Sequence, residues 1–288
     1  SRDPRGPAEP MALAVLASRG TPAAVRDALR DFSDRSPASL DAITAAFVAA
    51  LGAARWQQAD LLLAAGADVN GKAKTPDPKR PWLGSPLAAV FNQNQDNKSK
   101  LARAQRLFLN GATFANPQAN DALKWAASSN DIAAVTYLLA KGASPNGNPE
   151  RYAGNYYERM FTGPIESAGG GPGYGDTPFY MALQQATMNW ARRTPAEIAQ
   201  ADAEQRKARI NAVTLYRAGG RFVVGSLYDD LRQEPDIKVA SILLAAAQRA
   251  GRLTELTNRI LYPNGIDKPL NSGGTPQERA LVAYVQAV

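Results

Sequence analysis

The chain repeats one short phrase, and this repetition constrains the fold more than any other feature of the sequence. The segment "LLLAAGADVN" at 61–70 resembles "YLLAKGASPN" at 137–146, while "LFLNGATFAN" at 107–116 and "LYRAGGRF" at 215–222 are more divergent copies. Aligned on their first glycines, the copies follow one another at steps of 45, 31 and 77 residues. One step is close to about 33 residues, a period typical of helical repeat proteins. The aligned glycines are Gly66, Gly111, Gly142 and Gly219.

Each copy has the pattern of an apolar helix that ends at a glycine. In the first copy, Leu61, Leu62 and Leu63 close the helix, and Gly66 supplies the left-handed residue beyond it. The same stretch, read from Gly66, nearly spells the phosphate-binding pattern G-x-x-x-x-G-K-[ST], with Ala73 where a hydroxyl is required. That loop needs a strand before it and a helix after it. We therefore expect this segment to end a helix and not to bind a nucleotide.

A second phrase has the pattern of a helix start. In "GSPLAAVF" at 84–91 and "DTPFYMAL" at 176–183, a Ser or Thr precedes a proline and an apolar run. The hydroxyl can cap the helix, and proline suits the first helical position because that N–H has no partner in the helix. The segment "NDALKWAASSND" at 120–131 fits the same place, with Asn120 or Asp121 as the expected cap.

Together the two phrases resemble the ankyrin repeat. The histidine that follows Thr-Pro-Leu in the family is replaced by Ala88 and Tyr180, which indicates a divergent array. The resemblance covers about 39–225 and implies an all-α solenoid of about five to six stacked helix pairs with long inserted loops. The matching residues are Ser85-Pro86-Leu87, Thr177-Pro178-Phe179, Leu61-Leu62-Leu63 with Gly66-Ala67-Asp68-Val69-Asn70, and Leu138-Leu139 with Gly142-Ala143 and Asn146.

The helical pattern divides the chain into three parts. We expect a disordered or processed N-terminal tail at 1–10, a repeat array at 11–225, and a C-terminal helical cap at 226–288. Insertions interrupt the array at 70–84 and 142–176, the second being too long for an ordinary connection. No segment alternates polar and apolar residues for long, so we expect little strand. The expected helices are paired within 11–33, 38–65, 85–93 with 99–110, 120–129 with 131–141, and 177–218, where Thr194 and Pro195 start a long second helix; two or three helices follow at 226–261, and a last one at 275–288 begins at Thr275.

The two inserted loops hold the candidate binding residues. The first combines four cations with one aromatic residue and could contact an acidic protein face or phosphate; the alternative is a solvated basic loop. The second is rich in Tyr, Arg and Met, which are common anchors of protein interfaces; the alternative is that its aromatic residues pack on the repeats. The candidates are Lys72, Lys74, Lys79, Arg80 and Trp82 in the first loop, and Tyr152, Tyr156, Tyr157, Arg159 and Tyr174 in the second, with Met160 and Phe161 beside them. Trp56, Trp125 and Trp190 lie on expected helices, where packing within or between repeats is the better explanation.

Composition excludes several kinds of chemistry. The chain of 288 residues has no Cys and no His, so it can form no disulfide, thiolate nucleophile, Ser-His-Asp triad or standard zinc site. No apolar run is long enough to predict a membrane span. We expect no metal and no cofactor. The net charge of +7 is modest for this length, and it is too scattered to predict nucleic-acid binding.

The resemblance implies a non-catalytic protein–protein interaction module that uses loop tips and a concave helix face. Bacterial relatives of this kind include toxin-neutralising immunity proteins and effectors, and the Ala- and Arg-rich composition suggests a bacterial source. The alternative is an all-α hydrolase that cleaves glycans with two carboxylates, for which Glu158 and Glu166 are the candidates. The absence of cysteine is compatible with export but does not require it. We slightly favour a periplasmic or secreted protein, with its signal peptide removed, over a cytoplasmic one.

Overall fold

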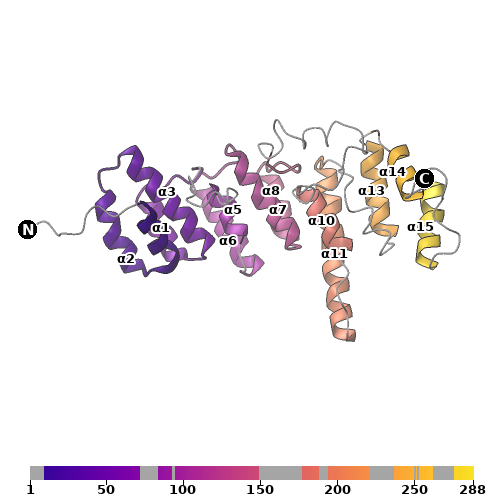
Figure 1. The fold of residues 1–288 in the computed structure, drawn as a ribbon, viewed down its shortest axis with the longest axis horizontal. Helices are drawn as coiled ribbons and strands as arrows, with labels where there is room; N and C mark the ends of the chain where they lie inside the picture. The colour runs from indigo at the N-terminus through magenta and orange to yellow at the C-terminus, as the bar shows by residue number, and fades with distance from the viewer. Residues whose placement is uncertain are drawn as a thin grey trace, which may run out of the picture. The chain divides into compact units, whose positions relative to one another are not determined.

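The computed structural model describes residues 10–71, 84–92, 95–148, 177–187, 194–220, 237–249, 251, 253–261 and 276–288. Within these residues the chain is helical and contains no strand, which confirms the predicted all-α class (Figure 1). The chain divides into two compact units, which are described separately here. Unit 1 comprises Ser1–Trp125 with Ala140–Ala143, and unit 2 comprises Ala126–Leu139 with Ser144–Val288.

The helices of unit 1 follow the predicted pairs. Helix α7 begins in unit 1 and ends in unit 2. The elements are α1 (Pro10–Arg19), α2 (Pro22–Ala28), the 3-10 turn η1 (Leu29–Phe32), α3 (Pro37–Gly52), α4 (Trp56–Ala64), α5 (Pro86–Phe91), α6 (Asn97–Leu109), the 3-10 turn η3 (Pro117–Asn120) and α7 (Asp121–Ser128).

Unit 2 contains the long second helix that the sequence predicted. This helix, α11, starts with a capping box at Thr194: the Thr194 hydroxyl accepts from the Glu197 N–H, and the Glu197 carboxylate accepts from the Thr194 N–H. The elements of unit 2 after α7 are α8 (Ile132–Ala140), α10 (Pro178–Thr187), α11 (Pro195–Arg217), α13 (Ile237–Arg249), α14 (Leu253–Leu261) and α15 (Pro276–Ala287).

The Ser/Thr-Pro phrases cap helices as predicted. The Ser85 hydroxyl accepts from the Ala88 N–H at 3.5 Å, and the Thr177 hydroxyl accepts from the Tyr180 N–H at 3.1 Å. Thr21 caps α2 in the same way. A side-chain acceptor at this position satisfies one of the N–H groups that a helix start leaves without a partner.

One predicted helix start was wrong. Helix α6 begins at Asn97, because the Asp96 carboxylate accepts from the Ser99 N–H at 2.8 Å and caps the helix earlier than expected. Before α7, η3 runs directly into the helix. Helix α7 begins at Asp121, within the predicted 120–129, and the Asn120 amide donates to the Pro117 carbonyl at 3.1 Å. The predicted cap Thr275 lies outside the described residues.

Helix packing in unit 1 brings neighbouring pairs into contact. The first helices lie in a row, with α3 packed against both α1 and α5, and the second helices α2 and α4 also touch (Figure 1). Side chains join adjacent pairs as well: the Gln58 amide donates to the Gly20 carbonyl at 3.0 Å, and the Arg55 Nε donates to the Ser18 carbonyl at 3.3 Å. The first pair is therefore held by the second, and α3 of the second pair packs against α5 of the third.

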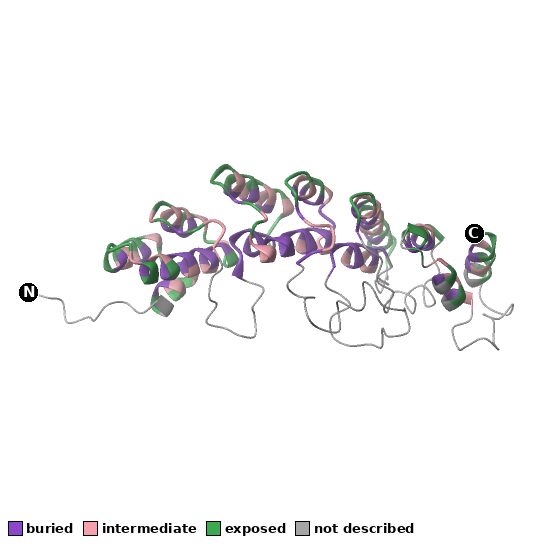
Figure 2. Cartoon of the chain, turned by 90° about the horizontal axis from the view of Figure 1, so that it is seen from above, coloured by how far each residue is buried: buried purple, intermediate pink, exposed green. Residues whose placement is uncertain are grey.

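The two helices of a pair are buried to different degrees. Every residue of α5 is buried, whereas α4 buries only Gln58, Ala59 and Leu62 among its nine residues. Figure 2 shows the same contrast, because one helix of a pair is mostly purple while its partner is pink and green. In unit 2, α10 is mostly buried, while the first turns of α11 are exposed. The second helices therefore offer the larger outer surface.

Candidate functional site

The predicted binding residues lie outside the described part of the chain. This holds for the basic loop (Lys72, Lys74, Lys79, Arg80 and Trp82), for the aromatic loop (Tyr152, Tyr156, Tyr157, Arg159 and Tyr174), and for the alternative catalytic acids Glu158 and Glu166. The structure therefore tests neither loop hypothesis, and both stay predictions. It does describe the points from which the loops leave the helices, and these points are built alike.

Four helix ends share one design. The aligned glycines Gly66, Gly111, Gly142 and Gly219 have φ values of 105°, 90°, 97° and 100°, in the left-handed region that favours glycine. Four residues before each glycine stands a buried leucine. After the first three glycines an alanine is buried, and the residue beyond it turns the chain with a side-chain oxygen. The leucines are Leu62, Leu107, Leu138 and Leu215, and the alanines are Ala67, Ala112 and Ala143.

Backbone hydrogen bonds explain why the phrase needs these residues. The Ala67 N–H donates to the Leu62 carbonyl at 3.1 Å, and the Gly66 N–H donates to the Leu63 carbonyl at 3.1 Å. This pair of bonds is the Schellman helix end, and it buries the leucine beneath the turn. The Gly71 N–H donates to the Asp68 carbonyl. The predicted helix end at Gly66 is therefore confirmed, and the Gly71 amide closes the turn that follows it.

The asparagine at the end of the phrase joins one loop to the next. The Asn70 Nδ2 donates to the Gly111 carbonyl at 2.9 Å, and its Oδ1 accepts from the Thr113 N–H at 2.7 Å and from the Thr113 hydroxyl at 3.2 Å. The Asn116 amide in turn donates to the carbonyls of Asn70 and Gly71. The residue from which the predicted basic loop departs, Gly71, is thus fixed against the following helix end.

The turns between the two helices of a pair also repeat. In three pairs, the second residue after the first helix has a positive φ and its N–H donates to a carbonyl three residues earlier: Ala54 at φ 56°, Asn130 at φ 54° and Gly251 at φ 70°. The second helix begins two residues later in each case. Asn130 adds a contact within unit 2, because its Nδ2 donates to the Glu204 carboxylate of α11 at 3.1 Å.

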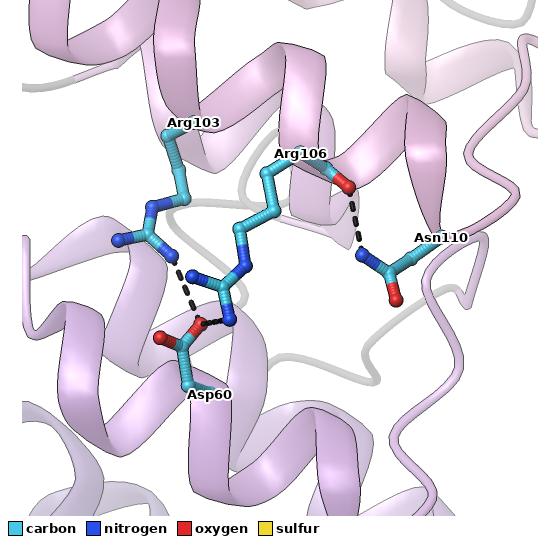
Figure 3. Close-up of polar contacts among 4 residues, drawn as sticks. All are labelled: Asp60, Arg103, Arg106 and Asn110. Atoms are coloured by element: carbon cyan, nitrogen blue, oxygen red, sulfur yellow. Dashed lines mark hydrogen bonds and ion pairs between the residues drawn. The ribbon is translucent and has the colours of Figure 1, made fainter.

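Charged and aromatic side chains fasten α6 to α4, and Figure 3 shows the ion pairs of Asp60 with Arg103 and Arg106. The Asp60 Oδ1 lies 2.9 Å from Arg103 Nη1 and 3.1 Å from Arg106 Nη2, so one carboxylate oxygen serves two guanidinium groups. The Arg103 guanidinium also stacks over the Trp56 ring, at 4.7 Å from its centroid. Arg103 is 16% exposed and Arg106 is 52% exposed. Partial burial makes the Arg103 pair the stronger of the two.

Trp56 therefore packs between neighbouring helix pairs, as expected, although it is half-buried and does not lie in the core. Trp125 is half-buried with the Lys124 Nζ over its ring, and Trp190 lies outside the described residues. The role of the Asp60 group was not predicted. A signal was present: Trp56 and Asp60 are four apart on one helix, and Arg103 and Arg106 are three apart on another, which places each pair on one helix face.

Unit 2 has its own connection between pairs. The Arg249 guanidinium stacks on the Tyr216 ring at 3.8 Å and donates to the carbonyls of Tyr216 and Gly220, the latter at 2.8 Å. These carbonyls belong to the end of α11, where a positive charge is favourable. The Tyr216 hydroxyl donates to the Ala245 carbonyl at 3.3 Å.

The ionisable groups of the described residues support structure. The Ser99 hydroxyl and N–H lower the pKa of the Asp96 carboxyl, and the Ser39 hydroxyl lowers the pKa of Asp34. The Lys207 ammonium lowers the pKa of Glu204 despite its partial burial, and burial raises the pKa of Tyr137. Each lowered carboxyl lies beside a helix start or an ion pair. In the described ranges, no group of three or more Asp or Glu residues could hold a metal ion.

The described surface offers hydrogen-bonded loops, ion pairs and stacked cations. Among the helices that the structure describes, none is long and apolar enough to cross a membrane. No protein-family model, curated protein or solved structure matches this chain.

Proposed function

We propose that this chain is a divergent ankyrin-like repeat array that binds a protein partner and has no catalytic activity. The observation that carries the proposal is a helix end that recurs four times, each with a left-handed glycine four residues after a buried leucine, at Gly66, Gly111, Gly142 and Gly219. A unit of two short helices cannot bury its apolar face alone, so such units are stable when they stack on one another. The contacts of α3 with α1 and α5 support this arrangement for the first three pairs.

The position of the loops supports a binding role. Binding residues are often carried by loops on a rigid scaffold, and both inserted loops leave the helices directly after a repeated helix end. Asn70 and Asn116 hold the base of the first loop. The second begins after Gly142, where the Ser144 hydroxyl accepts from the Asn146 N–H. The cations of the first loop and the aromatic residues of the second suit a partner with an acidic face and apolar side chains.

In this proposal the protein acts by covering its partner's surface. Neutralisation of a secreted toxin is one such role, and action as an effector in a host is another. Both would use the aromatic loop as a central anchor, where removal of one tyrosine side chain costs about 2 kcal/mol or more.

The test begins with affinity purification from the source organism and continues with the purified partner. Replacement of both Tyr156 and Tyr157 by Ala should weaken partner binding at least tenfold in biolayer interferometry, since a loss of about 1.4 kcal/mol corresponds to a factor of ten. Tyr284→Ala, which removes a tyrosine from α15, is the matched control and should retain affinity. Circular dichroism must show that both proteins remain helical.

Two results would count against the proposal in different ways. An unchanged affinity of the double variant would remove the aromatic loop from the interface. If no protein is retained reproducibly by the unmodified chain under several growth conditions, the binding function itself is wrong.

A further inference from the structure

One outer helix of unit 1 presents an exposed stripe of unusual composition. The stripe runs along α6, and its members recur at spacings of three and four residues, which places them on one helix face. All five are exposed. We call this set the α6 stripe: Lys98, Ala102, Gln105, Arg106 and Leu109.

Positive charge exceeds negative charge along this helix. The segment Asn97–Leu109 contains four Lys or Arg residues and no Asp or Glu, and α5, which packs against it, has no charged residue. The two carboxylates that the described residues place beside α6 are engaged. Asp60 is shared between Arg103 and Arg106, and Asp96 accepts from the Ser99 N–H and hydroxyl. One carboxylate cannot balance two guanidinium groups, so the stripe favours an acidic ligand.

The stripe also holds apolar residues at a helical period. Leu109 is 88% exposed, and Ala102 stands seven residues before it, two turns earlier on the same face. A small residue allows a second helix to approach closely, while full burial of a leucine is worth about 1.5–3 kcal/mol. Beside Leu109, the rings of Phe108 and Phe114 lie 5.8 Å apart, and the Lys141 Nζ lies 5.7 Å from the Phe108 centroid. The apolar end of the stripe is therefore also flanked by a cation.

The corresponding face of α8 has a different composition. Its exposed residues are Ala133, Thr136 and Ala140, none of which is charged. Exposed cations are thus not a general property of the second helices. The spacing of the α6 cations also differs from that of a nucleic-acid site, because Lys98 and Arg106 flank apolar positions and do not form a continuous basic track.

From these observations we infer that the α6 stripe binds an acidic amphipathic helix of a protein partner. The partner helix lies along α6 with an aliphatic side chain against Ala102 and Leu109, and its carboxylates face Lys98 and Arg106. This mode matches the anchors at i, i+3, i+4 and i+7 that helical ligands use. The inference rests on the proposed function and adds a second contact surface, on the outer helices, to the loops.

A photo-crosslinking experiment tests this surface. A photoreactive phenylalanine analogue replaces Ala102 in one protein and, as the matched control, Ala133 on α8 in another. Each protein is expressed in the source organism and irradiated, and the crosslinked segment is identified by mass spectrometry. Affinity for the purified partner is then measured with Leu109→Ser and with the double variant Lys98→Glu/Arg106→Glu. The control for charge is Arg30→Glu, at an exposed cation elsewhere in unit 1.

We expect crosslinks from position 102, but not from 133, to a segment with Asp or Glu on one side of an aliphatic helical stripe. Leu109→Ser and the charge reversal should each weaken binding at least tenfold, and the effect of the reversal should shrink at high salt because ions screen exposed charges. Arg30→Glu should bind normally. Crosslinks to nucleic acid or to a basic segment, equal crosslinking from both positions, or an unchanged affinity of the stripe variants would overturn the inference.

The outcome also separates this inference from the proposed function. If the aromatic-loop variant loses the partner while the stripe variants retain it, the binding function stands and the stripe is not its interface. If the unmodified chain retains no partner, both proposals fall.

Discussion

Replacement of Asn70 by Ala tests whether side chains between loops hold neighbouring helix pairs together. Asn70 makes three hydrogen bonds to the following helix end, one donated to the Gly111 carbonyl and two accepted from Thr113. A typical intramolecular hydrogen bond contributes about 0.5–1.5 kcal/mol. These bonds are close to solvent, so we take the lower half of that range. The variant should then be destabilised by about 1.5–3 kcal/mol.

Asn70→Asp separates the contribution of the hydrogen bonds that the amide oxygen accepts from that of the bond that the amide nitrogen donates. A carboxylate can still accept from the Thr113 N–H, and a charged acceptor strengthens that bond. It cannot donate to the Gly111 carbonyl and instead opposes that oxygen with a negative charge. Near neutral pH, Asn70→Asp should therefore lie between the unmodified protein and Asn70→Ala in stability.

Urea unfolding followed by circular dichroism gives the stability, and native-state hydrogen exchange gives the local effect. In Asn70→Ala the protection of the Thr113 amide from exchange should fall about tenfold or more, because the free energy of local opening decreases by about 1.4 kcal/mol. Asn110→Ala is the control. Its amide donates to the Arg106 carbonyl within the same helix end, so its loss should leave Thr113 protected. Unchanged protection at Thr113 in Asn70→Ala would refute the idea that this side chain couples the loops.

Three further predictions follow from the described residues. Gly142→Ala should destabilise the protein by about 1 kcal/mol through backbone strain alone, because φ is 97° and a Cβ there meets no atom within 4 Å. The control is Gly52→Ala, at a helical position where a Cβ also meets no atom within 4 Å. It should be neutral or stabilising in the same urea titration. Ser99→Ala should raise the pKa of Asp96 in an NMR titration, because it removes the main cause of the lowered pKa. A carboxyl whose pKa is lower in the folded state stabilises the protein above its unfolded-state pKa, and this stabilisation is lost as pH falls through the folded-state pKa. Ser99→Ala should therefore make stability less dependent on pH in the acid range. An unchanged pKa of Asp96 in the variant would contradict this. Asn211→Leu should raise stability by about 1 kcal/mol, because Asn211 is fully buried on α11 and, in the described part of the chain, neither its Nδ2 nor its Oδ1 has a hydrogen-bond partner; a loss of stability would indicate that a buried water satisfies the amide.

The sequence predicted helix ends better than contacts between helices. Gly66 and Gly219 could be placed because a left-handed residue after an apolar run is a local requirement. Thr177 and Thr194 could be placed for a similar reason, since a hydroxyl before a proline satisfies an N–H within the same turn. The start of α7 was placed correctly, but the 3-10 turn η3 before it, capped by Asn116, was not predicted.

Contacts over longer distances were not predictable from the pattern. Asp60 pairs with arginines more than 40 residues later, and nothing in the local sequence selects these partners. The same is true of the cation of Arg249, which covers the end of α11 from a later helix. The candidate loops were recognised by composition alone, and composition gives residue types without their arrangement.

The helix end of α11, at Leu215 and Gly219, has a consequence for how such a chain can change during evolution. Leu215 and Gly219 occupy the same places as Leu62 and Gly66, although α11 has 23 residues and α4 has nine. The additional turns lie at the beginning of the helix, where Pro195 through Gln200 are exposed. Because the buried leucine is fixed relative to the glycine at the end of the helix, a helix can gain turns at its start while its last turn keeps the same contacts. Such growth would add new outer surface without redesign of the interior.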